Sequence, residues 1–181
     1  MQNSFIAVGS GGFRIHPKPR GGEWLESDLQ TFRADGIQIL VSLLTASETE
    51  ELRLAQESQL CAEVGLEFMS FPIPDRQVPA FRESFQEFVE SLASRLTAGQ
   101  YAVFHCRAGL GRAPLLGCAV LVHTGTPPIQ AWELIAQWRG QDVPDTEEQR
   151  KWISDGGGMT FEDALTISMS NGDYGEMQGL E

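Results

Sequence analysis

The amino-acid sequence predicts an α/β fold in which a central, mainly parallel sheet is flanked by helices on both faces. Two apolar runs, residues 37–44 and 101–105, lack polar alternation, which is typical of strands that are buried on both faces. Between them, residues 79–96 carry apolar side chains at helical spacing. Strands that alternate with helices in this way indicate a parallel sheet.

The other elements follow in order along the chain. We expect strands at residues 5–8, 37–44, 66–71 and 101–105, and helices at residues 24–34, 47–64, 79–96, 113–123, 128–138 and 146–153. Thr45 or Ser47 is a suitable N-cap for the helix at 47–64, and Gly65 ends that helix. Two segments, residues 9–12 and 17–22, are rich in glycine or proline and are expected to be loops.

Length and composition indicate one domain followed by a short tail. The 181 residues are enough for a single core, which we expect to occupy residues 1–153. From Ser154 onward the chain is acidic, passes through a triple glycine at 156–158 and has no clear hydrophobic period. Residues 154–181 are therefore predicted to form a weakly ordered tail.

The charge of the chain argues against several kinds of partner. Thirteen Lys and Arg stand against 25 Asp and Glu, a net charge of -12, which disfavours nucleic acid and anionic membrane surfaces. The sequence has no apolar run long enough to span a bilayer and no basic region followed by an apolar run at its N-terminus. We therefore expect a cytoplasmic protein without nucleic-acid or membrane partners. The oligomeric state is left open.

The three cysteines have neither the spacing of a metal site nor that of a disulfide framework. Cys61 and Cys118 look like ordinary helix residues. Three cysteines without a disulfide pattern fit a reducing compartment. We expect no metal and no other cofactor.

The segment from His105 to Arg112 predicts a loop that binds an anion. It reads His-Cys-Arg-Ala-Gly-Leu-Gly-Arg and lies between a predicted strand and a predicted helix. The backbone N–H groups of such a loop and the N-terminus of the helix together form a cradle for phosphate. Gly109 and Gly111 permit backbone angles that other residues resist. The guanidinium of Arg112 matches two oxygens of a phosphoryl group.

Cys106 lies at the mouth of this cradle and is a candidate nucleophile. The thiolate is the reactive form of cysteine, and a helix N-terminus and a nearby arginine both favour it. Pro114 suits the first turn of the helix, where its missing N–H costs nothing. We therefore expect Cys106 to be ionised at neutral pH and to attack the bound anion.

These residues resemble the signature of the cysteine-dependent protein tyrosine phosphatase superfamily: His-Cys, five loop residues and Arg, usually followed by Ser or Thr. The sequence Gly-Arg-Ala-Pro at residues 111–114 is most similar to the Gly-Arg-Ser-Pro of dual-specificity phosphatases. Upstream, Phe-Pro-Ile-Pro-Asp at 71–75 resembles the mobile loop that carries the general acid of the superfamily. Residues 36–152 resemble the subgroup that includes the cyclin-dependent kinase inhibitor 3 type enzymes and many bacterial relatives, which implies a dual-specificity phosphatase-like fold.

The resemblance implies a phosphomonoester hydrolase of the protein tyrosine or dual-specificity type, acting through a phosphocysteine intermediate. Cys106 would attack phosphorus, and Asp75 would protonate the leaving oxygen and later accept a proton from water. The resemblance implies that His105 orients the loop and tunes the sulfur of Cys106, as structural support rather than as a catalytic residue. The substrate oxygens would be held by Arg107, Ala108, Gly109, Leu110, Gly111 and Arg112.

One position departs from the pattern of the family. Ala113 stands where the superfamily usually has a hydroxyl that bonds the cysteine sulfur and helps it to leave. Its absence predicts slower hydrolysis of the intermediate and leaves open a phosphoprotein-binding module with little turnover. A rhodanese-like sulfurtransferase also uses a cysteine loop with an arginine, but Asp75 and the six-position step from Cys106 to Arg112 argue against it.

The expected substrate is a phosphorylated protein or a small phosphomonoester. Inositol phosphates are disfavoured because Arg107 is the one basic residue between Cys106 and Arg112. Farther along, Asp145 and Gln149 faintly resemble a water-positioning loop of related enzymes. Because Asp145 stands where a glutamine would be expected, the sequence assigns no role to this segment.

Overall fold

The structure, a computed structural model, describes residues 5–157. Its strands are β1 (Ile6–Val8), β2 (Gly11–Pro17), β3 (Ile39–Ser42), β4 (Glu67–Ser70) and β5 (Tyr101–Cys106). Its helices are a 3-10 turn η1 (Gly22–Trp24), α1 (Leu25–Ala34), α2 (Ala46–Glu51), α3 (Glu57–Val64), α4 (Arg82–Thr97), α5 (Arg112–His123), α6 (Pro128–Arg139), α7 (Glu147–Trp152) and a π-helical turn η2 (Ile153–Gly157).

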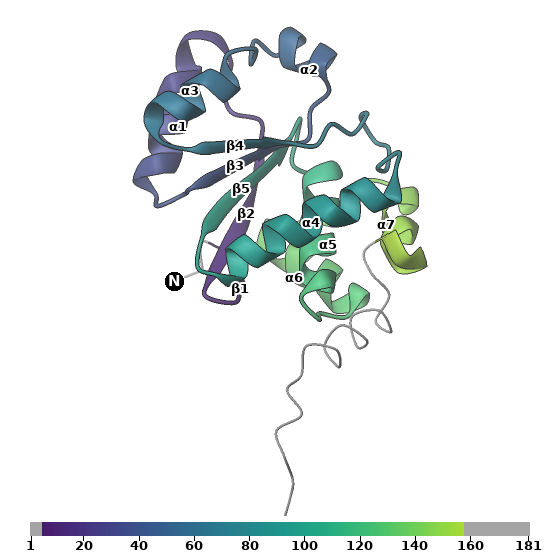
Figure 1. Ribbon diagram of the computed structural model, residues 1–181. Coiled ribbons are helices and arrows are strands. Elements are labelled where there is room, and N and C mark those ends of the chain that lie inside the picture. The colour runs from purple at the N-terminus through teal and green to yellow at the C-terminus, as the bar shows by residue number, and fades with distance from the viewer. Residues whose placement is uncertain (1–4, 158–181) are drawn as a thin grey trace, which may run out of the picture.

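The five strands form one sheet in the order β1-β2-β5-β3-β4. The pairs β2–β5, β5–β3 and β3–β4 are parallel, and only the edge pair β1–β2 is antiparallel. Helices α1 and α3 lie on one side of the sheet, and α4, α5 and α6 lie on the other (Figure 1). The predicted α/β class, with a mainly parallel sheet covered on both faces, is confirmed.

Each face of the sheet supports its own hydrophobic core, because alternate residues of a strand point to opposite faces. On β5, Phe104 packs into the larger core under α4, α5 and α6. Its neighbour Val103 packs into the smaller core under α1 and α3. Both side chains are fully buried, which explains why this strand is a continuous apolar run in the sequence.

Strand β2 was missed by the sequence analysis, which placed loops at residues 9–12 and 17–22 and no strand between them. The glycines at its start are required by close packing rather than by a turn. A Cβ at Gly11 would lie 2.1 Å from the carbonyl oxygen of Gln100, and one at Gly12 would lie 2.5 Å from that of Ile6. Glycine inside a strand marks such an approach of another backbone segment.

The single helix predicted at residues 47–64 is wrong, because the chain forms two helices there. Arg53 has a left-handed backbone (φ 58°), and the next residue, Leu54, turns into the smaller core. Glu48 and Glu57 are nine residues apart, about two and a half turns of a continuous helix, so they would face opposite sides. The break allows both side chains to be buried.

Two further boundaries bear on the site and on the predicted tail. The carboxyl ends of the parallel strands lie on the same side of the sheet, where β5 points toward α2 (Figure 1). In α/β sheets the ligand commonly binds at these carboxyl ends.

Residues 154–157, which were expected to belong to the tail, continue from α7 in the turn η2. Residues 158–181 lie outside the described part of the chain. Among residues 5–157, no helix has the length and apolar character needed to cross a membrane.

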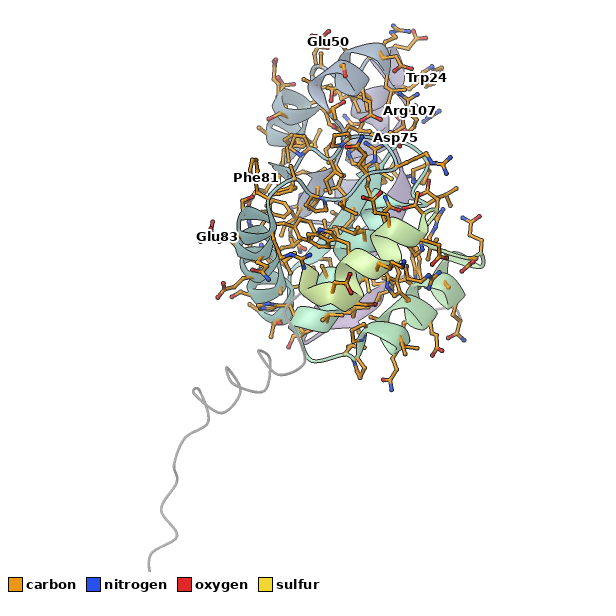
Figure 2. The ribbon with its side chains drawn as sticks, turned by 90° about the vertical axis from the view of Figure 1, so that its right-hand side faces the viewer. Trp24, Glu50, Asp75, Phe81, Glu83 and Arg107 are labelled. Atoms are coloured by element: carbon orange, nitrogen blue, oxygen red, sulfur yellow. The ribbon has the colours of Figure 1, made fainter. Side chains whose placement is uncertain are left out.

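Strand β2 can be tested through the fully buried side chain of Phe13, whose ring stacks on that of Phe104 with centroids 4.6 Å apart. We expect Phe13→Ala to lower the free energy of unfolding by about 3–5 kcal/mol, measured by urea denaturation. Phe81 is the matched control, since it is 75% exposed and projects from the start of α4 (Figure 2). Phe81→Ala should change that free energy by less than about 0.5 kcal/mol. Equal effects of the two variants would contradict the packing described here.

Candidate active site

The loop between β5 and α5 wraps around the sulfur of Cys106. Cys106 is the last residue of β5 and is buried. Its Sγ accepts a hydrogen bond from the backbone N–H of Gly109 at 3.3 Å. Helix α5 starts at Arg112 and spans 12 residues, so the positive end of its dipole is directed at the loop. The predicted sequence of strand, loop and helix is present.

Glycine is required at both Gly109 and Gly111, because a side chain at either position would come too close to a neighbouring segment. Gly109 has φ 73°, and a Cβ there would approach the backbone of His16 and Pro17 at 3.0–3.1 Å. A Cβ at Gly111 would lie 2.1 Å from the carboxylate oxygen Oδ1 of Asp145 and 2.9 Å from the amide oxygen Oε1 of Gln149. The loop is therefore held between the end of β2 and the segment that leads into α7.

The guanidinium of Arg112 is buried and makes a two-pronged ion pair with Glu48 from α2. Its Nη1 lies 2.7 Å from Oε2 of Glu48, and its Nη2 lies 2.9 Å from Oε1. Nη1 also donates to the carbonyl of Ile73 at 2.8 Å, and Nη2 donates to Oδ1 of Asp75 at 2.8 Å. Arg112 thereby joins the loop, helix α2 and the segment that carries Asp75.

Glu48 is held ionised by its surroundings. Burial opposes its charge, but hydrogen bonds from Arg112 and from the backbone N–H of Thr45, with the charge of Arg112, lower the pKa of Glu48 to about 2. Thr45 and Glu48 also form a capping box at the start of α2. The carboxylate of Glu48 therefore both caps helix α2 and pairs with Arg112.

Asp75 lies on a loop that is tied down on both sides. Ile73 donates its N–H to the carbonyl of Leu43, at the end of β3. Beyond Asp75, the N–H of Gln77 bonds the carbonyl of Pro74, and Nε2 of Gln149 donates to the carbonyl of Gln77 at 3.0 Å. The side chain of Asp75 is 56% exposed and remains in contact with Arg112.

Arg107 lies at the rim of the loop, where its guanidinium binds Glu51 at 2.7 and 3.1 Å and approaches Glu48 at 3.4 Å. In Figure 2, Arg107 and Asp75 lie in the upper part of the molecule, below Trp24 and Glu50. Ala108 is exposed and Leu110 is partly exposed at the same rim.

His105 points to the opposite face of the sheet from Cys106 and is fully buried. Its Nε2 lies 3.1 Å from Oε1 of Glu57, at the start of α3. The two groups are at ion-pair distance but are not aligned for a hydrogen bond. His105 therefore lies behind the loop, as a supporting residue would.

Three side chains of the site were not singled out as functional by the sequence analysis, or were given no role: Glu48, Glu57 and Gln149. The Thr-x-x-Glu spacing of a capping box marks Glu48 as a helix-start residue, but nothing in the sequence shows that it reaches Arg112. Gln149 is buried against Gly111, and its Oε1 has no hydrogen-bond partner. Within residues 5–157, no group of three or more His, Cys, Asp or Glu side chains is placed to hold a metal ion.

Comparisons with known proteins identify relatives of this chain. A family model described as "Polymorphic toxin system, DSP-PTPase phosphatase" matches residues 17–126. Cyclin-dependent kinase inhibitor 3 of Mus musculus is 27% identical over 150 residues, covering 82% of this chain and 68% of that protein. Among solved structures, Tk-PTP in the active form has a TM-score of 0.65 and 25% identity, covering 86% of this chain and 97% of that one.

A further solved structure supports the fold alone. Kinase associated phosphatase, crystallised with its catalytic site cysteine replaced by serine, has a TM-score of 0.71 and 23% identity to this chain. The match covers 80% of this chain and 83% of that one.

The ion pair between Glu48 and Arg112 predicts a pH-dependent stability. Because the pKa of Glu48 is about 2 in the folded protein and about 4.3 in an unfolded chain, its contribution is full above the unfolded value. It is lost as the pH falls through the folded value. We expect Glu48→Gln to lower the free energy of unfolding by roughly 3 kcal/mol at pH 7.

Urea denaturation at pH 7, 5 and 3 would measure this effect, with the exposed Glu23→Gln as the control. The difference between the wild type and Glu48→Gln should shrink toward pH 3, while Glu23→Gln stays close to the wild type throughout. A difference that is independent of pH would mean that Glu48 acts only through packing.

Proposed function

The chain belongs to the DSP-PTPase family of cysteine phosphatases, and from this premise we propose that it hydrolyses phosphomonoesters through a phosphocysteine intermediate on Cys106. The observation that carries the proposal is the convergence of two distant segments. Asp75 lies 2.8 Å from the guanidinium of Arg112, and Arg112 closes the loop that wraps the sulfur of Cys106. A nucleophile, an anion-binding arginine and a proton donor are thereby collected at the carboxyl end of β5.

In the first step, the thiolate of Cys106 attacks phosphorus and an S–P bond forms as the bond to the leaving oxygen breaks. The backbone N–H groups of residues 107–111 and the guanidinium of Arg112 are the donors for the three remaining phosphoryl oxygens. Donors fixed in advance stabilise charge that develops in the transition state. The hydrogen bond from Gly109 to Sγ and the dipole of α5 support the thiolate form.

Asp75 supplies the proton that the leaving oxygen needs and then takes one from the attacking water. Water then attacks the phosphocysteine and the S–P bond breaks. The thiolate of Cys106 is regenerated and inorganic phosphate is released. The anchoring of the loop at Ile73 and Gln77 supports this role, because it keeps the carboxyl group of Asp75 beside the guanidinium of Arg112. With Asp75 protonated, Nη2 of Arg112 loses an anionic partner and gains capacity for the substrate.

We propose a phosphorylated protein as the substrate, of the tyrosine or dual-specificity type. The relative from mouse is named as a kinase inhibitor and a solved neighbour as a kinase associated phosphatase. Arg107 would contact the substrate only after giving up its partner Glu51. Inositol phosphates, which carry several negative charges, are disfavoured because the rim of the loop offers little unpaired positive charge to bind them. The family membership gives no support to the alternative of a sulfurtransferase.

A second candidate function, a phosphoprotein-binding module with little turnover, is favoured by one position. Ala113 is fully buried at the start of α5 and supplies no hydroxyl to the sulfur of Cys106. Loss of one hydrogen bond to a charged group is worth roughly 1.5–3 kcal/mol, or about ten- to a hundredfold in rate. The phosphocysteine would then form readily and break down slowly.

The catalytic proposal predicts that Cys106→Ser abolishes release of phosphate from an aryl phosphate and from phosphotyrosine and phosphothreonine peptides. Asp75→Asn should lower kcat by roughly a hundredfold or more, because general acid catalysis contributes about 10²–10⁴. It should also retain bound substrate long enough for capture. Exposed Asp142→Asn is the control and should keep wild-type turnover. Phosphate release by Cys106→Ser at the wild-type rate would overturn the proposal.

The departure at Ala113 is tested by restoring the hydroxyl. We expect Ala113→Ser to raise kcat by about tenfold if breakdown of the phosphocysteine limits turnover. Rapid-mixing kinetics should show a burst of the aryl product in the wild type that shrinks in Ala113→Ser. A wild type that binds phosphopeptide, shows one burst and releases no phosphate would establish the binding module instead.

A further inference from the structure

Behind the catalytic loop, the structure buries a histidine and a glutamate together. Nε2 of His105 lies 3.1 Å from Oε1 of Glu57. The side chain of His105 is 0% exposed and that of Glu57 is 2% exposed. The reaction steps proposed above use neither group, although His105 is the immediate chain neighbour of Cys106.

The burial of Glu57 requires a compensating charge. A carboxylate without water or partners is strongly destabilised in a protein interior, and neither oxygen of Glu57 accepts a hydrogen bond. One turn farther along α3, the thiol of Cys61 is neutral, because burial and then the charge of Glu57 raise its pKa to about 12. The side chain that lies at ion-pair distance from Glu57 is His105.

The other groups that face this pair do not replace it. His16 and Ser42 are the register partners of His105 on β2 and β3. Burial lowers the pKa of His16, and the charges of Arg14 and His105 lower it further. Arg107 and Arg112, on the loop side, are already bound to Glu51 and Glu48. Glu57 is therefore the carboxylate that we pair with His105.

The pair lies directly behind Cys106 in the chain. His105 is joined to Cys106 by a peptide bond, and the two side chains point to opposite faces of β5. A positive charge behind the loop would favour a thiolate in it. Resting on the proposed function of Cys106, we propose that Glu57 is a positioning residue: it keeps His105 charged and fixed behind the loop and so holds Cys106 ionised.

The pH profile of alkylation at Cys106 tests this role, because a purely structural contribution would not move it. Cys61 and Cys118 are expected to react with iodoacetamide only at much higher pH, because burial raises the pKa of both thiols. In Glu57→Gln we expect the midpoint of the profile to rise by roughly one pH unit. Alkylation at pH 6 would then be up to about tenfold slower than in the wild type.

The chain offers a matched control and a charge-preserving variant. Glu50 lines the same surface groove as Glu57 but is exposed, so Glu50→Gln should leave the profile unchanged. Glu57→Asp keeps the negative charge and should stay close to the wild type, even if it lowers thermal stability. Should Glu57→Gln fail to fold, His105→Gln removes the cation itself and is expected to raise the midpoint by a similar amount.

The outcomes separate this proposal from the proposed function. A Glu57→Gln profile that superposes on a wild-type profile with a low midpoint would overturn the role of Glu57 and leave the nucleophile in place. A shift of Glu57→Asp as large as that of Glu57→Gln would also overturn it, because the charge would then be irrelevant. A wild-type Cys106 that is alkylated only above about pH 8, as an unperturbed thiol is, would overturn both.

Discussion

The buried ion pair between Arg112 and Glu48 is the constraint on which the rest of the site depends. A guanidinium that is 1% exposed needs a partner that is equally fixed, because an unpaired charge in the interior is strongly destabilising. Glu48 meets this need with both oxygens, and it is fixed in turn by the cap of α2. The orientation of Arg112 is therefore set before any phosphate arrives, which is what preorganised stabilisation of a transition state requires.

The same pair explains why the chain breaks where it does. If residues 47–64 formed one helix, Glu48 and Glu57 would lie on opposite sides of it. The left-handed turn at Arg53 redirects the chain, so that one carboxylate meets Arg112 on the loop side and the other meets His105 behind it. Two short helices replace one long helix, so that Glu48 reaches Arg112 on one side of β5 and Glu57 reaches His105 on the other.

The sequence could predict what is local and could not predict what is brought together by the fold. The strand, loop and helix around Cys106 are contiguous, so their residue types and spacing indicated both the structure and the chemistry. Asp75 could be placed only by resemblance, since its contact with Arg112 joins segments far apart in the chain.

Strand β2 was missed because Gly11 and Gly12 are typical of a turn. Glycine is needed at these positions because the backbone of Gln100 and of β1 packs too closely to leave room for a side chain. The partner of His105 was not foreseeable, because Glu57 looks like an ordinary residue at the start of a helix.

The balance of charge around the loop shows what the backbone must contribute. Arg107 and Arg112 are paired with Glu48, Glu51 and Asp75, so the five side chains together carry more negative than positive charge when all are ionised. The two arginines alone therefore do not make this mouth attractive to a phosphate dianion, in a chain whose net charge is already -12. The loop amides and the N-terminus of α5 supply the remaining positive field. In the mechanism that we propose, a proton on Asp75 would both remove one anion from this mouth and supply the proton donor, so that a single carboxyl group would couple binding of the substrate to the first step.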